Sequence, residues 1–373
     1  MSDTKPLDRP IRVAVWGPGT IGTAAIREIA LLPHLELVSI YAYSEAKHGV
    51  DAGKLANIEP TGVMATTSID EFLAAGPDCV FYAARDVGDW RADSDLVMLL
   101  ERGFNVVTVL PYQYPQARGD GAFEKLEAAA LRGNATLYAT GINPGFMFER
   151  LLMTATGLAN GIEHVQLSEF VNVEHISGAT EFLTAMGFGM ETASPEAVEV
   201  IARTVGNYLT PYLYSSADRM GLSVERVERE DLHVPTPVDL DVPGLFTLKA
   251  GTAGLVSFRW TAYCDGRPRL STQVKWYATD AMRPEEAQGR GDDFWIIDID
   301  GRPAVRLFVE LAGSLEGDRE HPDNPTHVSM LATAIPALQA ISDVVAAEPG
   351  VMIAGGPRFN WKDYGAALAG NAG

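Results

Sequence analysis

Between Ile11 and about Gly145, short apolar runs alternate with segments whose apolar residues recur every three or four positions. Runs with the continuous apolar character of buried strands are 11–17, 35–44, 64–68, 78–84, 105–110 and 134–139. The segments with helical spacing are 20–33, 69–76, 93–103 and 121–133. Strands and helices that alternate at this interval predict an α/β domain built on a doubly wound parallel sheet, with helices on both faces.

After Gly145 the pattern changes. A helix near 146–160 and a strand at 164–177 precede a long helical stretch at 195–220. From Val224 to Gly313 strand follows strand, and "CDGRPR" and "DIDGRP" carry Asp-Gly hairpin signals, which predicts a second α+β domain with an antiparallel sheet. The apolar helix expected at 328–350 would suit burial against the first domain. We therefore expect one domain from 1–145, completed by 326–373, and another from 146–325.

A glycine-rich loop joins the first strand to the first helix. It consists of Gly17, Pro18, Gly19, Thr20, Ile21 and Gly22, which form a G-x-G-x-x-G pattern. Glycines let the backbone turn tightly and approach a pyrophosphate, whose charge meets the free N–H groups at the start of the helix. Because this loop ends a strand, opens a helix and begins an alternating β/α domain, it predicts a Rossmann-type dinucleotide-binding domain.

The end of the second strand bears on the choice of nucleotide. An NAD site usually has an acidic residue about 20 positions beyond the loop, where this chain has Ser44. Lys47 and His48 follow closely, and a hydroxyl group beside a cation suits the 2′-phosphate of NADP. Glu45 could still bind a ribose diol, so we expect NADP and keep NAD as possible.

The carboxyl ends of parallel strands form the ligand-binding edge of such a sheet. We expect the residues there to meet the cofactor or the substrate: Ala83, Ala84, Leu110, Tyr112, Gln113, Asn143 and Pro144. Ala83 and Ala84 are small enough for a cofactor to pass close by. Tyr112 and Asn143 are candidate catalytic groups, and the amide of Asn143 can both donate and accept hydrogen bonds.

The second domain should supply the opposite wall of the site. In "SEFVNVEHIS", strand alternation places Glu169 and Val171 on one face and Phe170 and Asn172 on the other. Glu169 and His175 are the candidate acids or bases, because histidine titrates near neutral pH and a carboxyl group in an apolar strand can have a shifted pKa. His175 could equally be a surface or capping residue, and Glu169 a solvated one.

Composition excludes several classes of protein. The net charge is −20 and no basic block occurs, so nothing indicates that the protein binds a nucleic acid or an anionic membrane. Cys79 and Cys264 are read as buried thiols, and no cluster has the spacing of metal ligands. The polar N-terminus lacks a signal region, and no apolar run approaches membrane-spanning length. We expect a cytoplasmic protein that acts on a small molecule.

Four motifs together carry a family resemblance: "VAVWGPGTIG", "YSEAKHGVDAG", "GINPGF" and the C-terminal "ATAIPALQAISDVVAAEPGVM". With them the chain resembles the dihydrodipicolinate reductase-like superfamily, and within it the branch of 2,4-diaminopentanoate dehydrogenases and native amine dehydrogenases. The resemblance implies a nicotinamide-dependent enzyme that interconverts an amine or imine and a carbonyl. It also implies a homodimer that pairs through the open sheet of the second domain.

One departure from the amine dehydrogenases concerns the strand "NVVTVL". In those enzymes a carboxylate follows the matching strand and holds the amine, whereas "LPYQYP" here contains no acid. Tyr112 or Gln113 could take a polar role, or Glu169 could supply the acid. We therefore expect an amine dehydrogenase-like oxidoreductase. The alternatives are a reductase of a ketone or activated double bond that uses no ammonia, or an inactive nucleotide-binding sensor.

Overall fold

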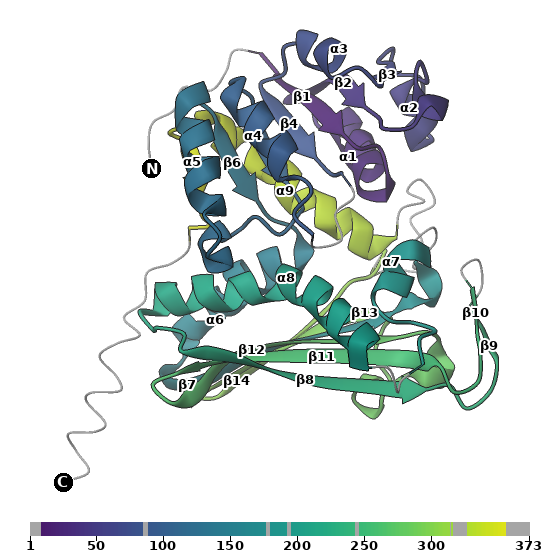
Figure 1. Cartoon of the computed structure of the whole chain (residues 1–373), viewed down its shortest axis with the longest axis vertical. Coiled ribbons are helices and arrows are strands. Elements are labelled where there is room, and N and C mark those ends of the chain that lie inside the picture. The colour runs from purple at the N-terminus through teal and green to yellow at the C-terminus, as the bar shows by residue number, and fades with distance from the viewer. Residues whose placement is uncertain are drawn as a thin grey trace. The chain divides into compact units, whose positions relative to one another are not determined.

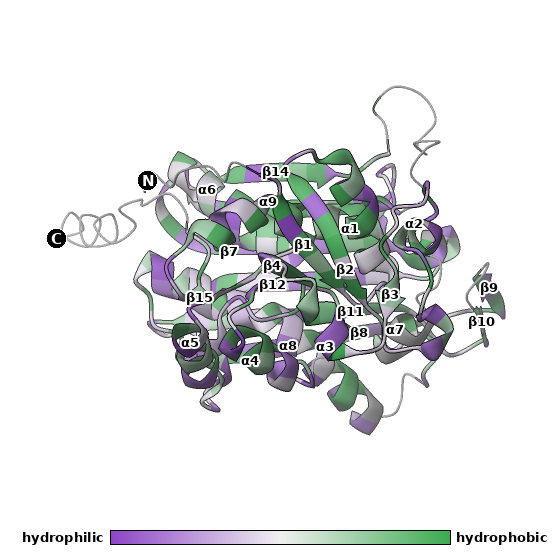
Figure 2. Ribbon diagram, turned by 90° about the horizontal axis from the view of Figure 1, so that it is seen from above, coloured by the Kyte–Doolittle hydropathy of each residue, from purple (hydrophilic) through white to green (hydrophobic). Residues whose placement is uncertain are grey.

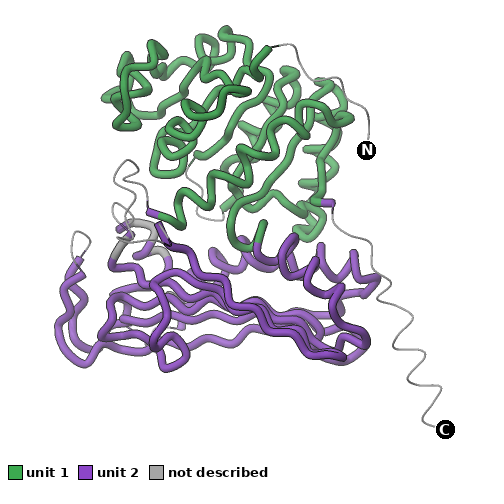
Figure 3. The backbone as a smooth tube through the Cα atoms, turned by 180° about the vertical axis from the view of Figure 1, so that it is seen from behind, with its two compact units in different colours: residues 1–146, 328–354 green, residues 147–327, 355–373 purple. Residues whose placement is uncertain are grey.

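A computed structural model of the chain describes residues 9–84, 89–176, 180–191, 195–242, 246–313, 315 and 327–355. The chain forms two compact units (Figure 3). Unit 1 comprises Met1–Phe146 and Val328–Ala354, and unit 2 comprises Met147–His327 and Gly355–Gly373. Each unit has its own sheet, and the two are described in turn.

Unit 1 contains a seven-stranded sheet in the order β15-β6-β5-β4-β1-β2-β3, in which every pair is parallel (Figure 1). Its strands are β1 (Ile11–Trp16), β2 (Leu35–Tyr41), β3 (Ala65–Thr66), β4 (Cys79–Tyr82), β5 (Asn105–Thr108), β6 (Thr136–Ala139) and β15 (Gly350–Met352). The predicted parallel, doubly wound sheet is therefore confirmed.

The two faces of this sheet follow the strand period of two. Val13 and Val15 of β1 pack in one core with α1 (Thr20–Leu31) and α9 (Val328–Ala346). Ala14 and Trp16 belong to the opposite core. That second core also contains residues of α3 (Ile69–Ala74), α4 (Asp93–Glu101) and α5 (Ala122–Gly133). Figure 2 shows the strands mainly in the colour of hydrophobic residues, as expected for a sheet buried on both faces.

Helix α9 joins unit 1 from the far end of the sequence. The expectation that no apolar run approaches membrane-spanning length is wrong here, because among the described residues this helix is long and apolar enough to cross a membrane by length and composition. However, Ala337, Leu338 and Ile341 are buried in the core that α9 shares with α1, β1 and β4. The apolar surface of α9 is thus used within the unit. The predicted helix at 328–350 ends at Ala346, and Gly350–Met352 instead form an edge strand beside β6.

Unit 2 contains a six-stranded sheet in the order β14-β13-β7-β12-β11-β8. Its strands are β7 (Asn160–Asn172), β8 (Arg226–Pro235), β11 (Ala253–Cys264), β12 (Arg267–Tyr277), β13 (Asp293–Arg302) and β14 (Val305–Glu310), and β9 (Leu240–Val242) pairs with β10 (Phe246–Leu248). Helix α8 (Pro195–Met220) lies along one face (Figure 1). The sheet is antiparallel, as expected, except that β7 and β12 run parallel.

The two predicted hairpins exist, but only one turns at its Asp-Gly pair. Asp265 and Gly266 have φ angles of 53° and 70°, and they form the tight turn between β11 and β12. In the second hairpin, Gly301 lies within β13 and the chain turns after Arg302. A Cβ at Gly301 would come 3.2 Å from the carbonyl oxygen of Asn160, so glycine at this position allows β13 and β7 to approach each other closely.

The remaining elements are short. They are η1 (Glu45–Lys47), α2 (Ala52–Ala56), η2 (Pro115–Arg118), the π-helical segment η3 (Ile142–Leu152), α6 (Met153–Ala155), η4 (Thr156–Leu158), η5 (Val173–His175), α7 (Thr180–Ala185), η6 (Asp280–Met282) and η7 (Glu285–Ala287).

Candidate functional site

The glycine loop has the geometry that a dinucleotide site requires. Gly17 has a φ angle of 90°, and a Cβ there would lie 2.9 Å from the carbonyl oxygen of Ala83. A Cβ at Gly22 would collide with the carbonyl oxygen of Gly17, so a side chain at this position would push α1 away from the loop. Gly19, by contrast, has no atom within 4 Å of a Cβ position and faces open space. Of the three glycines in this loop, Gly19 is therefore the one at which a side chain would not collide with the protein itself.

The first turn of α1 is suited to an anion. Gly19 is the N-cap residue, no side chain caps the helix, and no acidic residue occupies its first turn. The N–H groups and the positive end of the helix dipole therefore remain available to a phosphate. The loop residues fit the pyrophosphate of a dinucleotide.

A cation lies against this loop. Lys47 Nζ donates a 2.7 Å hydrogen bond to the carbonyl oxygen of Pro18, and the lysine is half-buried. Ser44 is exposed and precedes η1, in which Glu45 is the first residue. His48 is also exposed, and its Nδ1 accepts a 3.3 Å hydrogen bond from the backbone N–H of Thr67. The structure thus brings Lys47 to the glycine loop.

A polar cluster, in which Trp16 and Tyr82 are buried and Tyr43 is exposed, supports the end of β2 and was not predicted. Trp16 Nε1 donates to the hydroxyl of Tyr43 at 2.8 Å, and Tyr82 donates to Asp95 Oδ2 at 2.8 Å. Tyr43 also donates to Asp95, at 3.3 Å. Burial raises the pKa of Tyr82 and of Tyr43, so both phenols remain protonated donors at neutral pH. The cluster fixes the strand end that leads to Ser44.

Tyr112, a predicted catalytic residue, is buried behind the end of β5. Its hydroxyl donates a 2.6 Å hydrogen bond to Asp93 Oδ1, and Arg118 binds both oxygens of the same carboxylate. The Arg118 guanidinium in turn lies 4.2 Å from the ring centroid of Trp90. This arrangement joins the start of α4 to the segment after β5, and the catalytic role of Tyr112 remains a prediction. Leu110 is held by a bond from its N–H to Thr108 Oγ1.

The segment after β6 approaches its own backbone closely. A Cβ at Gly145 would lie 3.0 Å from Thr140 Oγ1, so only glycine fits without displacement of this turn. Asn143 is extended, with φ −131° and ψ 128°, and the Asn143–Pro144 peptide bond is cis. Asn143 is half-buried and Pro144 is buried. Asn143 therefore lies at the same edge of the sheet as Ala84 and Leu110, which follow β4 and β5.

Glu169, one of the predicted acids or bases, has both carboxylate oxygens held by hydrogen bonds. It is 5% exposed, and its Oε1 and Oε2 accept hydrogen bonds from Trp276 Nε1 and Trp295 Nε1 at 2.7 and 2.9 Å. The predicted alternation is confirmed, because Phe170 stacks on Phe294 at 4.5 Å within a separate core. On β13, Asp293 lies 3.4 Å from His327 Nε2. The side chain of His175 lies outside the described residues.

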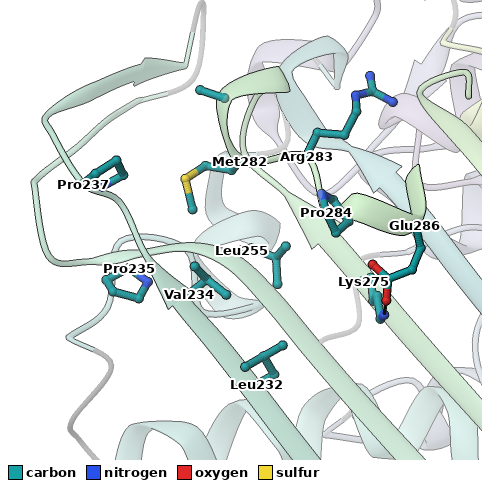
Figure 4. A pocket seen from close by; sticks show the side chains of 11 residues that line it. Leu232, Val234, Pro235, Pro237, Leu255, Lys275, Met282, Arg283, Pro284 and Glu286 are labelled. Atoms are coloured by element: carbon teal, nitrogen blue, oxygen red, sulfur yellow. Dashed lines mark hydrogen bonds and ion pairs between the residues drawn. The ribbon is translucent and has the colours of Figure 1, made fainter. Parts of the chain in front are cut away.

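The opposite face of this sheet carries a hollow of about 500 Å³ (Figure 4). Its lining is mainly apolar and includes Leu232, Val234, Leu255 and Met282. A 2.5 Å ion pair between Lys275 and Glu286 lies at its edge. None of the predicted site residues lines this hollow.

Sequence analysis missed Glu149, which is buried in η3. Ser215 of α8 donates a 2.6 Å hydrogen bond to its Oε1, while Oε2 is buried without a hydrogen-bond partner among the described residues. Burial raises the pKa of Glu149 to about 7, although the bond from Ser215 and the charges of Arg219 and Arg150 act in the opposite direction. The sequence around Glu149 gave no sign of this burial, because its partner Ser215 lies on α8, far away in the sequence.

Among the described residues, no group of three or more His, Cys, Asp or Glu side chains could hold a metal ion. Cys79 and Cys264 are buried free thiols.

Comparison with known proteins agrees with this geometry. Residues 11–82 match the family model "Dihydrodipicolinate reductase, N-terminus". The chain is 28% identical over 353 residues to an amine dehydrogenase from Streptomyces virginiae, which covers 91% of this chain and 94% of that protein.

Two solved structures share the fold. The structure of an amine dehydrogenase from Mycobacterium smegmatis matches 93% of this chain and 96% of its own, with a TM-score of 0.74 and 21% identity. GenD2 from gentamicin A biosynthesis, solved in complex with NAD, matches 92% of this chain and 88% of its own, with a TM-score of 0.50 and 14% identity.

The parallel sheet, the glycine loop and the similarity to an amine dehydrogenase over most of the chain indicate an NAD(P)-dependent dehydrogenase, and residues 11–82 resemble the N-terminal part of dihydrodipicolinate reductases. Within that class, the predicted resemblance to the amine dehydrogenases is confirmed, because the similarity to the S. virginiae protein extends over nearly the whole chain.

The glycine loop generates the first prediction. Gly19→Asp should fold normally, because the position is open, but it should lose NADPH binding, because its carboxylate would repel the pyrophosphate. Gly22→Ala should instead lower the melting temperature, because its methyl group would meet the Gly17 carbonyl. Thermal unfolding and NADPH titration by protein fluorescence separate the two effects. Normal NADPH binding by Gly19→Asp would reject this loop as the phosphate site.

Glu149 generates the second prediction. Because its pKa is raised to about 7 in the folded state, the folded protein binds more protons than the unfolded chain between about pH 4.5 and 7. The free energy of unfolding should therefore fall as pH rises through this window and then level off.

Glu149→Gln removes this titration. The stability of the variant relative to the wild type should increase by roughly 3 kcal/mol between pH 4.5 and 8. Urea unfolding at several pH values measures this difference. Parallel stability curves for the two proteins would show that Glu149 does not titrate in this window.

Proposed function

We propose that this protein is an amine dehydrogenase-like oxidoreductase that uses NAD(P)H and acts on a small, apolar carbonyl, imine or amine. A carbonyl and ammonia lose water to give an imine, and the imine takes up a hydride and a proton to give the amine. The proposal rests on a glycine loop whose helix start is open to an anion. This loop occurs in a chain that is similar over 91% of its length to an amine dehydrogenase.

The bound nicotinamide cofactor would supply or accept the hydride. In our proposal the loop from Gly17 to Gly22 holds the pyrophosphate, and the backbone N–H groups at the start of α1 are the donors. Ala83 and Ala84 bring a backbone without bulky side chains close to this loop, as the contact with Gly17 indicates. Leu110, Asn143 and Pro144 follow the neighbouring strands β5 and β6 and complete the edge. Asn143 is the polar group at this edge that we assign to the nicotinamide or the substrate.

Glu169 is the group that we propose as the acid of the substrate unit. Two indole N–H groups fix both of its oxygens, and these donors are neutral, so they orient the carboxylate without adding a formal positive charge. A carboxylate held in this way can stabilise the iminium ion that forms when the imine is protonated. His175, at the end of η5, remains our candidate proton donor. Tyr112 holds Asp93, and we therefore give it a supporting role in the proposed site.

We propose NADP as the preferred cofactor. The support is Lys47, whose ammonium group is held on the carbonyl oxygen of Pro18 in the phosphate loop. Ser44 and His48 are both exposed beside it. A 2′-phosphate placed at the end of β2 would meet this cation together with a hydroxyl group and an imidazole.

We also propose that the protein is a cytoplasmic homodimer. The support is the face of the unit 2 sheet opposite α8, where β11 and β12 present the apolar hollow around Leu255 and Met282 (Figure 4). A two-fold axis would bring the same patch of two copies together. Light scattering after gel filtration tests for the mass of two chains.

The activity itself is tested with a panel of small ketones and NADPH, with and without ammonia. We expect NADPH oxidation that depends on ammonia, followed at the absorbance of the reduced nicotinamide, and formation of the amine. Oxidation that is equally fast without ammonia would favour the reductase of a ketone or activated double bond. Nucleotide binding without turnover of any substrate would contradict an enzyme and favour a sensor.

Lys47→Ala tests the cofactor preference. It should weaken NADPH binding about tenfold, because it removes a charged partner of the 2′-phosphate, and it should change NADH binding little. Lys47→Arg serves as the matched control, because it keeps the charge. Equal losses for the two nucleotides would contradict the preference for NADP.

A further inference from the structure

Gln113 has an unfilled hydrogen-bond acceptor. The residue is 5% exposed, and its Nε2 donates a 3.1 Å hydrogen bond to the carbonyl oxygen of Leu110. A carbonyl oxygen can only accept, so the amide nitrogen must face it and the orientation of the side chain is fixed. The amide oxygen Oε1 then points elsewhere, and it is buried without a hydrogen-bond partner among the described residues. A buried acceptor in this state destabilises the protein unless a ligand or a water fills it.

The position of this acceptor in the sheet makes a ligand the better explanation. Gln113 follows β5, and Thr140 follows β6, the parallel neighbour of β5. Thr140 is 1% exposed, and its Oγ1 is also buried without a hydrogen-bond partner in the described part of the chain. Two unfilled polar groups therefore follow adjacent strands at the carboxyl edge of the sheet, which is where doubly wound sheets bind their ligands.

The neighbouring residue Tyr112 has its hydroxyl group engaged within the protein, so it does not offer a group to a ligand in this arrangement. The hydroxyl of Tyr112 is directed to Asp93, and Arg118 holds the same carboxylate. Of the two adjacent polar side chains after β5, Gln113 is thus the one with an unfilled atom. An amide oxygen is a neutral acceptor of hydrogen bonds from N–H or O–H groups. Among the reactants of the proposed function, ammonia, the imine and the amine all carry N–H groups.

We propose that Gln113 Oε1 accepts a hydrogen bond from the nitrogen of the substrate, whether ammonia, imine or amine, and so determines specificity for this group. The inference rests on the proposed function. Because the amide carries no charge, it holds a neutral nitrogen group by geometry and gives a cation no ion pair. Binding of ammonia or an amine should therefore strengthen as pH rises and the neutral form accumulates.

Three variants test the proposal. Gln113→Leu removes the acceptor at similar size, and Gln113→Glu replaces it with a charged one. The control is Gln166→Glu, because both polar ends of Gln166 have partners, namely Ser168 and Arg259. Thermal unfolding confirms that each variant is folded. The measurements are the Kd of NADPH by fluorescence, the Kd of 2-aminobutane for the NADP complex by calorimetry, and the KM of ammonium chloride from pH 6 to 10.

We expect Gln113→Leu to raise the Kd of 2-aminobutane and the KM of ammonia about tenfold, with the Kd of NADPH unchanged. Gln113→Glu should bind the charged amine and flatten the pH dependence of both constants, a change that a purely structural residue would not cause. Gln166→Glu should behave as the wild type.

Two results would overturn the proposal. A loss confined to NADPH binding would mean that Oε1 serves the cofactor, and unchanged constants in both Gln113 variants would mean that a water fills the site. Failure of the proposed function is distinguishable from both. The calorimetric arm needs no turnover, so an absence of ammonia-dependent NADPH oxidation would reject the function, whereas wild-type-like amine binding by Gln113→Leu would reject the role of Gln113.

Discussion

The close contact between the start of α1 and the end of β1 is the constraint on which the cofactor half of this protein depends. Gly22 lies so near the carbonyl oxygen of Gly17 that no side chain fits, and Gly17 in turn lies against Ala83 after β4. Three segments are therefore joined through backbone alone. The same contact leaves Gly19 and the uncapped first turn of α1 open to an anion, and it provides the Pro18 carbonyl that holds Lys47.

Three polar side chains around the two sheets accept hydrogen bonds from aromatic donors. Trp16 supports Tyr43, Tyr112 supports Asp93, and two tryptophans hold Glu169. An indole or phenol group satisfies a buried acceptor without adding a formal charge, and its rigid ring loses little conformational freedom on burial. Glu169, which is 5% exposed, can therefore lie inside the protein in one orientation.

Regular patterns in the sequence predicted the sheet of unit 1. The edge strand β15, the pairing of β7 with β12 and the position of one turn were not predicted. Val13 and Val15 face one core and Ala14 and Trp16 the other, as a buried parallel strand requires. The three residues of β15 gave no signal, because a short run after a helix has no period of its own. The parallel pairing of β7 with β12 and the displaced turn at Gly301 depend on which strands become neighbours, and local sequence does not state this.

By itself, the sequence determined the fold class, the glycine loop and the resemblance to the amine dehydrogenases, because periodicity and motif spacing act over short stretches of chain. It also placed Tyr112, Gln113 and Asn143 at the carboxyl edge of the sheet. Only the tertiary structure decided which contacts these groups make. Tyr112 donates to Asp93, Gln113 retains an oxygen without a hydrogen-bond partner among the described residues, and Glu149 becomes a buried acid against Ser215. The partners of Tyr112 and Glu149 lie on other elements, and burial, which sets both hydrogen bonding and pKa, is a property of the assembled core.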